Sequence, residues 1–240
     1  MSYDGKTLRI SKDPSNYWWD SGNEGSSKMS KNVTSVDTNV KHSGSQSLYL
    51  KSQYVGLFGI GKFAAGNLFA GEFLGTDDTV YGILGWGRPF NTRPYAMRVW
   101  VKYTPGTVDY TETDQIKEGD LDIGKIYIAV GDWVGDDTTY PQWPVVVRTK
   151  GPKLFDPNSQ GTIGYGEIEF TETLQSSDGG MVERIIPINY GDYGGYDRIP
   201  KSIIIVATAS KYGDYYSGST GSTMWLDDLE LIYEESELSN

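Results

Sequence analysis

Residues 221–233, GSTMWLDDLELIY, predict a long β-strand near the end of the chain. Side chains alternate between the two faces of a strand, so one face carries Trp225, Asp227, Leu229, Leu231 and Tyr233. Four of these five are large and apolar, so we expect this face to contact the core and Asp227 to point inward. A buried carboxylate without partners is costly, so we expect Asp227 to meet hydrogen-bond donors, a cation or a structural calcium ion. The alternative is an edge strand whose acid pair is solvated.

Short apolar runs separated by Gly, Pro, Asn and Asp continue through the rest of the chain, and no long run has helical spacing. They predict ten strands without strand–helix alternation. This pattern indicates an all-β fold, a jelly-roll β-sandwich of two antiparallel sheets with little helix. The expected strands are Val33–Asp37, Gln46–Ser52, Val80–Gly85, Tyr95–Tyr103, Lys125–Asp132, Val145–Thr149, Ile163–Phe170, Val182–Asn189, Ser202–Ala209 and Thr223–Tyr233.

Two segments depart from simple alternation. Residues Ile203–Ala207 are apolar on both faces, which predicts a central strand. Residues Phe63–Phe73 are rich in Ala and Gly, and we expect an ordered loop or a single helical turn there.

The chain shows no linker and no internal repeat, so we expect one domain over residues 17–234, an N-terminal extension over 1–16, a frayed tail over 235–240 and a monomer.

The composition excludes several classes of protein. A net charge of −11 opposes binding to nucleic acid, and the absence of cysteine excludes disulfides and thiolate metal sites. No apolar run approaches the ~20 residues that span a bilayer, so we expect no transmembrane segment. The first residues do not resemble a signal peptide, so an exported form of the protein would have lost its leader.

Several separated motifs together resemble one family. They are Trp18-Trp19-Asp20-Ser21-Gly22-Asn23, the segments 61–71 (GKFAAGNLFAG) and 87–94 (GRPFNTRP), Lys102-Tyr103-Thr104-Pro105-Gly106, residues 210–218 (SKYGDYYSG), and Leu226-Asp227-Asp228-Leu229. In this order, over about Tyr17 to Tyr233, they resemble the putative carbohydrate metabolism domain of exported bacterial proteins. The resemblance implies a fold akin to carbohydrate-binding modules and a place at the cell surface, in the periplasm or outside the cell. It implies no catalytic residues.

The best candidate for sugar binding is the face of strand Tyr95–Tyr103 that carries Arg98, Trp100 and Lys102. The other face is apolar and predicts core contacts. A Trp between two cations suits a groove in which a sugar ring stacks on the indole while its hydroxyl groups bind polar side chains. The alternative is that this face is covered too, or that the stems of Arg98 and Lys102 shield Trp100.

Three more tryptophans, Trp86, Trp133 and Trp143, lie at strand ends or in loops, where they either close the sandwich or contact a ligand. Arg88 and Arg93 each precede a proline, which holds them extended. They either bind the carboxylate of an acidic sugar or form internal ion pairs with Asp20 or Asp214, and we favour the internal pairs.

These features predict glycan recognition by a cell-surface module that serves polysaccharide capture, with an oligosaccharide or polysaccharide as the partner. A glycoside hydrolase is the alternative, because a carboxylate pair could lie in the same groove. Candidates for such a pair are Asp20, Glu72, Glu167, Glu169 and Asp214. The third possibility is an adhesion module without a small ligand.

Overall fold

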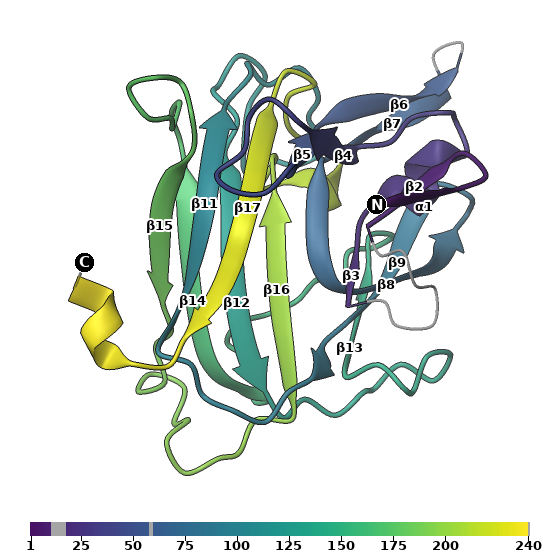
Figure 1. Ribbon diagram of the computed structural model, residues 1–240. Coiled ribbons are helices and arrows are strands. Elements are labelled where there is room, and N and C mark those ends of the chain that lie inside the picture. Colours follow the sequence, from purple (N-terminus) through teal and green to yellow (C-terminus); the bar gives the residue numbers. More distant parts are fainter. Residues whose placement is uncertain (11–17, 58–59, 240) are drawn as a thin grey trace.

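Two antiparallel sheets pack face to face in the computed structural model, which describes residues 1–10, 18–57 and 60–239 (Figure 1). This confirms the predicted all-β sandwich. The described residues form seventeen strands, because short strands at the edges add to the ten expected. The expected start of the domain at Tyr17 lies outside the described residues.

The larger sheet has eight strands, and its main path runs in the order β13-β9-β8-β16-β12-β14. The short strands β10 and β3 pair with β16 and β8. The strands of this sheet are β3 (Trp19–Asp20), β8 (Asn67–Asp77), β9 (Tyr81–Trp86), β10 (Arg88–Pro89), β12 (Gly124–Gly131), β13 (Val145–Arg148), β14 (Thr162–Phe170) and β16 (Ser202–Thr208).

The smaller sheet has five strands in the order β15-β11-β17-β5-β4. Its long central strands β11 and β17 lie in front of β12 and β16 in Figure 1. The strands of this sheet are β4 (Thr34–Asp37), β5 (Ser47–Lys51), β11 (Ala96–Thr104), β15 (Val182–Pro187) and β17 (Thr223–Ile232).

Two hairpins and three short helices complete the described fold, and they lie around the edges of the sheets (Figure 1). The hairpin β1–β2 contacts the only α-helix among the described residues. These elements are β1 (Ser2–Asp4), β2 (Thr7–Arg9), α1 (Asn23–Ser27), β6 (Gln53–Leu57), β7 (Ile60–Ala64) and the 3-10 helices η1 (Gly213–Tyr215) and η2 (Glu235–Ser239). No helix in the described part of the chain is long and apolar enough to cross a bilayer.

Strand β16 separates the two larger apolar clusters among the described residues, because both of its faces are buried. Ile203, Ile205 and Ala207 point into the core between the two sheets. Ile204 and Val206 point to the other side, where they join a second cluster with aromatic side chains of β8, β9 and β12. The predicted central position of Ile203–Ala207 is therefore confirmed, and the larger sheet has an apolar outer face.

The prediction of a loop or helical turn over Phe63–Phe73 is wrong, because the segment contains the end of β7 and most of β8. Its glycines mark close packing of the backbone. A Cβ atom on Gly66 would lie 2.3 Å from the amide nitrogen of Lys51, and one on Gly71 would lie 2.2 Å from the carbonyl oxygen of Gly85. Gly66 lies between β7 and β8 and Gly71 lies within β8, and glycine is favoured at both because another backbone approaches closely.

The prediction that Asp227 points into the core is also wrong, because a β-bulge interrupts β17. Trp100 pairs with Asp227 whereas Arg98 pairs with Glu230, so two residues of β17 lie opposite one residue of β11. Asp228 adopts a φ of 45° at this point. The extra residue in β17 shifts the alternation by one, so each side chain before the bulge lies on the opposite face from the one that regular alternation predicts. Leu226 therefore points into the core, and Asp227 lies on the outer face.

Candidate functional site

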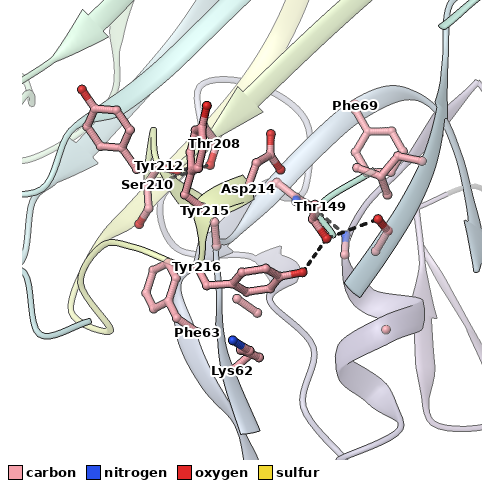
Figure 2. A pocket seen from close by; sticks show the side chains of 18 of the residues that line it. Lys62, Phe63, Phe69, Thr149, Thr208, Ser210, Tyr212, Asp214, Tyr215 and Tyr216 are labelled. Atoms are coloured by element: carbon pink, nitrogen blue, oxygen red, sulfur yellow. Dashed lines mark hydrogen bonds between the residues drawn. The ribbon is translucent and has the colours of Figure 1, made fainter. Parts of the chain in front are cut away.

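A cavity of about 690 Å³ lies on the outer face of the larger sheet, away from the smaller sheet. This volume falls within the ~300–1,000 Å³ of small-molecule sites. Strands β8, β9, β12 and β16 form its floor with Phe69, Trp86, Tyr127 and Val206. Its walls come from α1, the β6–β7 hairpin, the segment around Thr149–Pro157 and the loop at residues 210–216, much of which Figure 2 shows from close by.

Asp214 lies in η1 and lines this cavity. Its carboxylate has no hydrogen bond or ion pair among the described residues, and in Figure 2 no dashed line reaches it. Burial raises the pKa of this carboxyl to about 6, and no nearby cation opposes that effect. An uncompensated acid in an apolar cavity is a common property of functional sites.

Two buried carboxylates, those of Asp20 and Asp122, show how this protein satisfies an acid that serves the fold. Asp20 accepts hydrogen bonds from the backbone N–H groups of Ser21 and Phe73, both at 2.8 Å. Asp122 accepts hydrogen bonds from two serine hydroxyl groups and two backbone N–H groups. Burial raises the pKa of both carboxyls, yet both have fixed donors. Asp214 has none, which sets it apart from the structural acids.

The loop that carries Asp214 is fastened at both ends to the carboxylate of Asp122. The hydroxyl of Ser210 and the backbone N–H of Ser219 donate to the same oxygen of Asp122, at 2.6 and 2.7 Å. Between them, the hydroxyl of Tyr216 bonds to that of Thr149 across the cavity (Figure 2). These contacts fix the position of Asp214 over the floor of the cavity.

Tyr127 supplies a second free polar group. Its ring packs against Phe155 with a centroid distance of 6.0 Å and an interplanar angle of 4°. Its hydroxyl has no hydrogen-bond partner among the described residues. Burial raises the pKa of this phenol well above its ordinary value, and the nearby carboxylate of Asp214 adds to the shift. Tyr127 is therefore a protonated donor beside an unpaired acceptor.

Three of the four lysines among the described lining residues bind carboxylates that lie outside the lining. Lys62 binds Glu112 at 2.7 Å, and Lys125 binds Glu167 at 2.6 Å. Lys211 binds Glu169 at 2.7 Å, and Lys125 also lies 3.5 Å from that residue. A fourth lysine, Lys28, is exposed at the cavity.

Among the described lining residues Asp214 is the only acid, so Asp20, Glu72, Glu167 and Glu169 do not line the cavity beside it.

Of the predicted sugar-binding residues, Trp86 lines this cavity. It is 3% exposed, and its indole N–H has no hydrogen-bond partner. Trp143 is buried, and the guanidinium carbon of Arg88 lies 5.0 Å from the centroid of its ring. Arg88 donates to the carbonyl oxygens of Trp18 and Gly71, so it lacks the ion pair with Asp20 or Asp214 that we favoured.

The outer face of the smaller sheet carries Arg98, Trp100 and Lys102, as expected, and all three contact other residues. Trp100 stacks on His42 with ring centroids 3.5 Å apart. Arg98 forms ion pairs with Glu183 and Glu230, at 2.9 and 2.7 Å. Lys102 donates to the carbonyl oxygen of Gly179 at 2.7 Å. All three side chains are half-buried, and sugar binding on this face stays a prediction.

The remaining predicted residues do not line the cavity. Arg93 donates to the carbonyl oxygen of Tyr196. Trp133 donates to the hydroxyl groups of Ser159 and Thr162 and lines a separate cavity with charged walls. The structure thus brings together Trp86, Trp143 and Arg88 at the larger sheet and Arg98, Trp100 and Lys102 on the smaller sheet, and it leaves Arg93 and Trp133 apart from both groups.

Asp227 accepts hydrogen bonds from the backbone N–H groups of His42 and Ser43, at 2.9 and 3.2 Å. Over residues 1–10, 18–57 and 60–239, no group of three or more His, Cys, Asp or Glu side chains is arranged to hold a metal ion. A calcium ion at Asp227 stays a prediction.

Sequence reasoning missed the cavity and most of its residues. The available signal was the motif at residues 210–218, in which one aspartate stands among three tyrosines and two serines. In the sequence this motif supports only the family resemblance, because nothing there shows that the loop folds over an apolar sheet face. The sequence makes Asp214 a candidate only as a member of a carboxylate pair or as a partner for an arginine.

Residues 3–232 match the putative carbohydrate metabolism domain. The chain also resembles two solved structures. One, a putative glycoside hydrolase from Bacteroides vulgatus ATCC 8482, has a TM-score of 0.64 at 23% identity, over 90% of this chain and 85% of that one. The other, a putative glycoside hydrolase from Bacteroides thetaiotaomicron VPI-5482, has a TM-score of 0.63 at 24% identity, over 90% of this chain and 63% of that one. These likenesses show a shared fold. No protein of curated function matches the chain.

Proposed function

The chain belongs to the putative carbohydrate metabolism domain family, and from that premise we propose that it recognises a glycan in the cavity over β8, β9, β12 and β16. The observation that supports this most directly is an unpaired carboxylate, Asp214, in a cavity lined by aromatic side chains. Sugars present apolar C–H faces and directional hydroxyl groups, so they match such a lining.

Binding fits the described residues better than hydrolysis does. Glycoside hydrolases of the common types use two carboxyl groups about 5–9.5 Å apart across the scissile bond. The pKa of about 6 at Asp214 would suit a general acid. Among the described lining residues, however, no second acid faces the substrate space. We therefore propose a binding module for polysaccharide capture and keep hydrolysis as the competing function.

The test is isothermal titration calorimetry of the purified protein against a panel of neutral oligosaccharides, with a reducing-end assay on the same mixtures. We expect saturable binding without product. Removal of an aromatic ring from the cavity wall, by Tyr212→Ala or Tyr215→Ala, should weaken binding at least tenfold. The matched control is Tyr196→Ala, because Tyr196 is 69% exposed and does not line the cavity.

The outer face of the smaller sheet is the alternative location of the binding site, and one further variant distinguishes the two. Trp100→Ala should leave glycan affinity unchanged if the cavity is the site. Loss of binding in Trp100→Ala, together with normal binding in Tyr212→Ala, would place the site on the face predicted from the sequence. Release of reducing ends by the wild-type protein would establish hydrolysis instead.

We further propose that the protein acts at the cell surface, in the periplasm or outside the cell. The support is the absence of cysteine and the resemblance to exported proteins. Fractionation of native cells with an antibody against the domain tests this proposal, and recovery only with the cytosol would overturn it.

A further inference from the structure

The cavity has an unusual balance of charge. Three of its lysines, Lys62, Lys125 and Lys211, already bind glutamates that lie outside the lining. Asp214 is the acid that remains without a cation, and its carboxylate projects toward the enclosed space (Figure 2). A ligand that reaches the floor of the cavity therefore meets an uncompensated negative group. The exposed Lys28 lies where water screens its charge.

The polar groups of the cavity without a partner include one acceptor, the carboxylate of Asp214, and two donors, the hydroxyl of Tyr127 and the indole N–H of Trp86. Asp214 offers two carboxylate oxygens, and the hydroxyl of Tyr127 offers a proton. A sugar hydroxyl both donates and accepts, so it satisfies this pair. A sugar carboxylate or sulfate only accepts, so it would leave Asp214 without a donor and would add like-charge repulsion.

We propose that Asp214 is a specificity-determining residue, which makes the cavity select sugar units without a negative charge and reject uronic acids and sulfated sugars. This inference rests on the proposed glycan-binding function. Repulsion between like charges in a partly dehydrated cavity exceeds that in water, because the effective dielectric constant is lower. A discrimination of at least tenfold follows for ligands that differ only in the charged group.

The selectivity should depend on pH, because protonation of Asp214 removes the repulsion. The pKa of about 6 places this change between pH 7.5 and pH 5. The other charged or titratable groups that line the cavity are Lys28, Lys62, Lys125, Tyr127, Tyr165, Lys211, Tyr212, Tyr215 and Tyr216. Burial raises the pKa of the phenols of Tyr127, Tyr165 and Tyr216, so these groups keep their protons throughout this range. A uronic acid with an ordinary carboxyl also stays ionised above pH 5.

The experiment compares two probes by calorimetry, namely the neutral oligosaccharide that the wild-type protein binds best and the same oligosaccharide oxidised at C6 to the uronic acid. At pH 7.5 the wild-type protein should bind the neutral probe at least tenfold more tightly. Asp214→Asn should reduce this ratio to about threefold or less. The matched control is Asp197→Asn, because Asp197 is exposed and does not line the cavity.

The pH dependence of the wild-type protein keeps the test independent of how the variant folds. The affinity ratio should fall between pH 7.5 and pH 5, with a midpoint near pH 6. An equal ratio in wild-type protein and a folded Asp214→Asn, or a wild-type ratio that does not change with pH, would overturn the selectivity and leave glycan binding intact. If the protein bound none of the glycans in the panel, the proposed function would be overturned as well.

Discussion

The replacement Asp214→Asn should stabilise the folded protein at neutral pH. Burial raises the pKa of Asp214 from 3.8 to about 6. Since each tenfold change in proton affinity corresponds to about 1.4 kcal/mol, ionising this carboxyl in the folded state costs up to about 3 kcal/mol. Water in the cavity reduces this figure, because it solvates the charge. Asparagine has nearly the same shape and no charge, so it should recover most of the difference.

The sign of the pH dependence follows from proton binding. The folded state holds the proton of Asp214 more tightly than the unfolded state does. Stability therefore falls as the pH rises from about 4 to about 6, and the penalty is constant above that range. Below about pH 4 both states are protonated, so wild-type protein and Asp214→Asn should be equally stable.

The assay is urea unfolding of wild-type protein and Asp214→Asn at several pH values from 4 to 8. All other titrating groups are common to the two proteins, so they cancel in the difference between the free energies of unfolding. Asp197→Asn serves as the control and should give no difference. A difference that is constant from pH 4 to pH 8, or a variant that is less stable at pH 7, would refute the reasoning.

Three further changes test the account of the fold, with the free energy of unfolding or the Tm as the measurement. Gly66→Ala should cost at least about 2 kcal/mol, because a Cβ atom would overlap the backbone of β5, whereas Gly82→Ala has no contact closer than 3.7 Å and should cost far less. Equal losses would show that Gly66 is not tightly packed. Asp122→Ala should cost about 3 kcal/mol or more, because it leaves several buried donors without an acceptor, and a loss below about 1 kcal/mol would contradict this. If calcium binds at Asp227, EDTA should lower the Tm of wild-type protein but not of Asp227→Asn, and an unchanged wild-type Tm would reject the metal.

Strand positions and the sandwich could be predicted from the sequence, because the period of two in the apolar pattern survives in most strands. In β11, for example, Met97, Val99, Val101 and Tyr103 are fully buried while Arg98, Trp100 and Lys102 are not. The same rule failed in β17, because one bulge residue reverses the pattern without any mark in the composition. Glycines that allow close packing of the backbone, as in β8, also mislead the prediction, because glycine-rich segments are typical of loops.

The candidate site could not be predicted in the same way. Its lining comes from segments far apart in the chain, and Asp214 differs from other acids only in what it fails to contact. Sequence patterns report which residue types are present, whereas the lack of a partner is a property of the folded arrangement. Trp86 could be named from its type and position, but its place on the cavity floor depends on the pairing of β9 with β8 and β13.

The attachment of both ends of the Asp214 loop to Asp122 has a consequence for the thermodynamics of binding. A loop that is ordered only by its ligand loses conformational entropy at the moment of association, and this loss weakens affinity. Here the hydroxyl of Ser210 and the backbone N–H of Ser219 both donate to one carboxylate oxygen of Asp122, so the loop is ordered by contacts within the protein itself. Preorganisation of this kind should give rapid association and little change in the amide hydrogen exchange of residues 210–219 on binding, so that affinity is set by the contacts in the cavity and not by the folding of its wall.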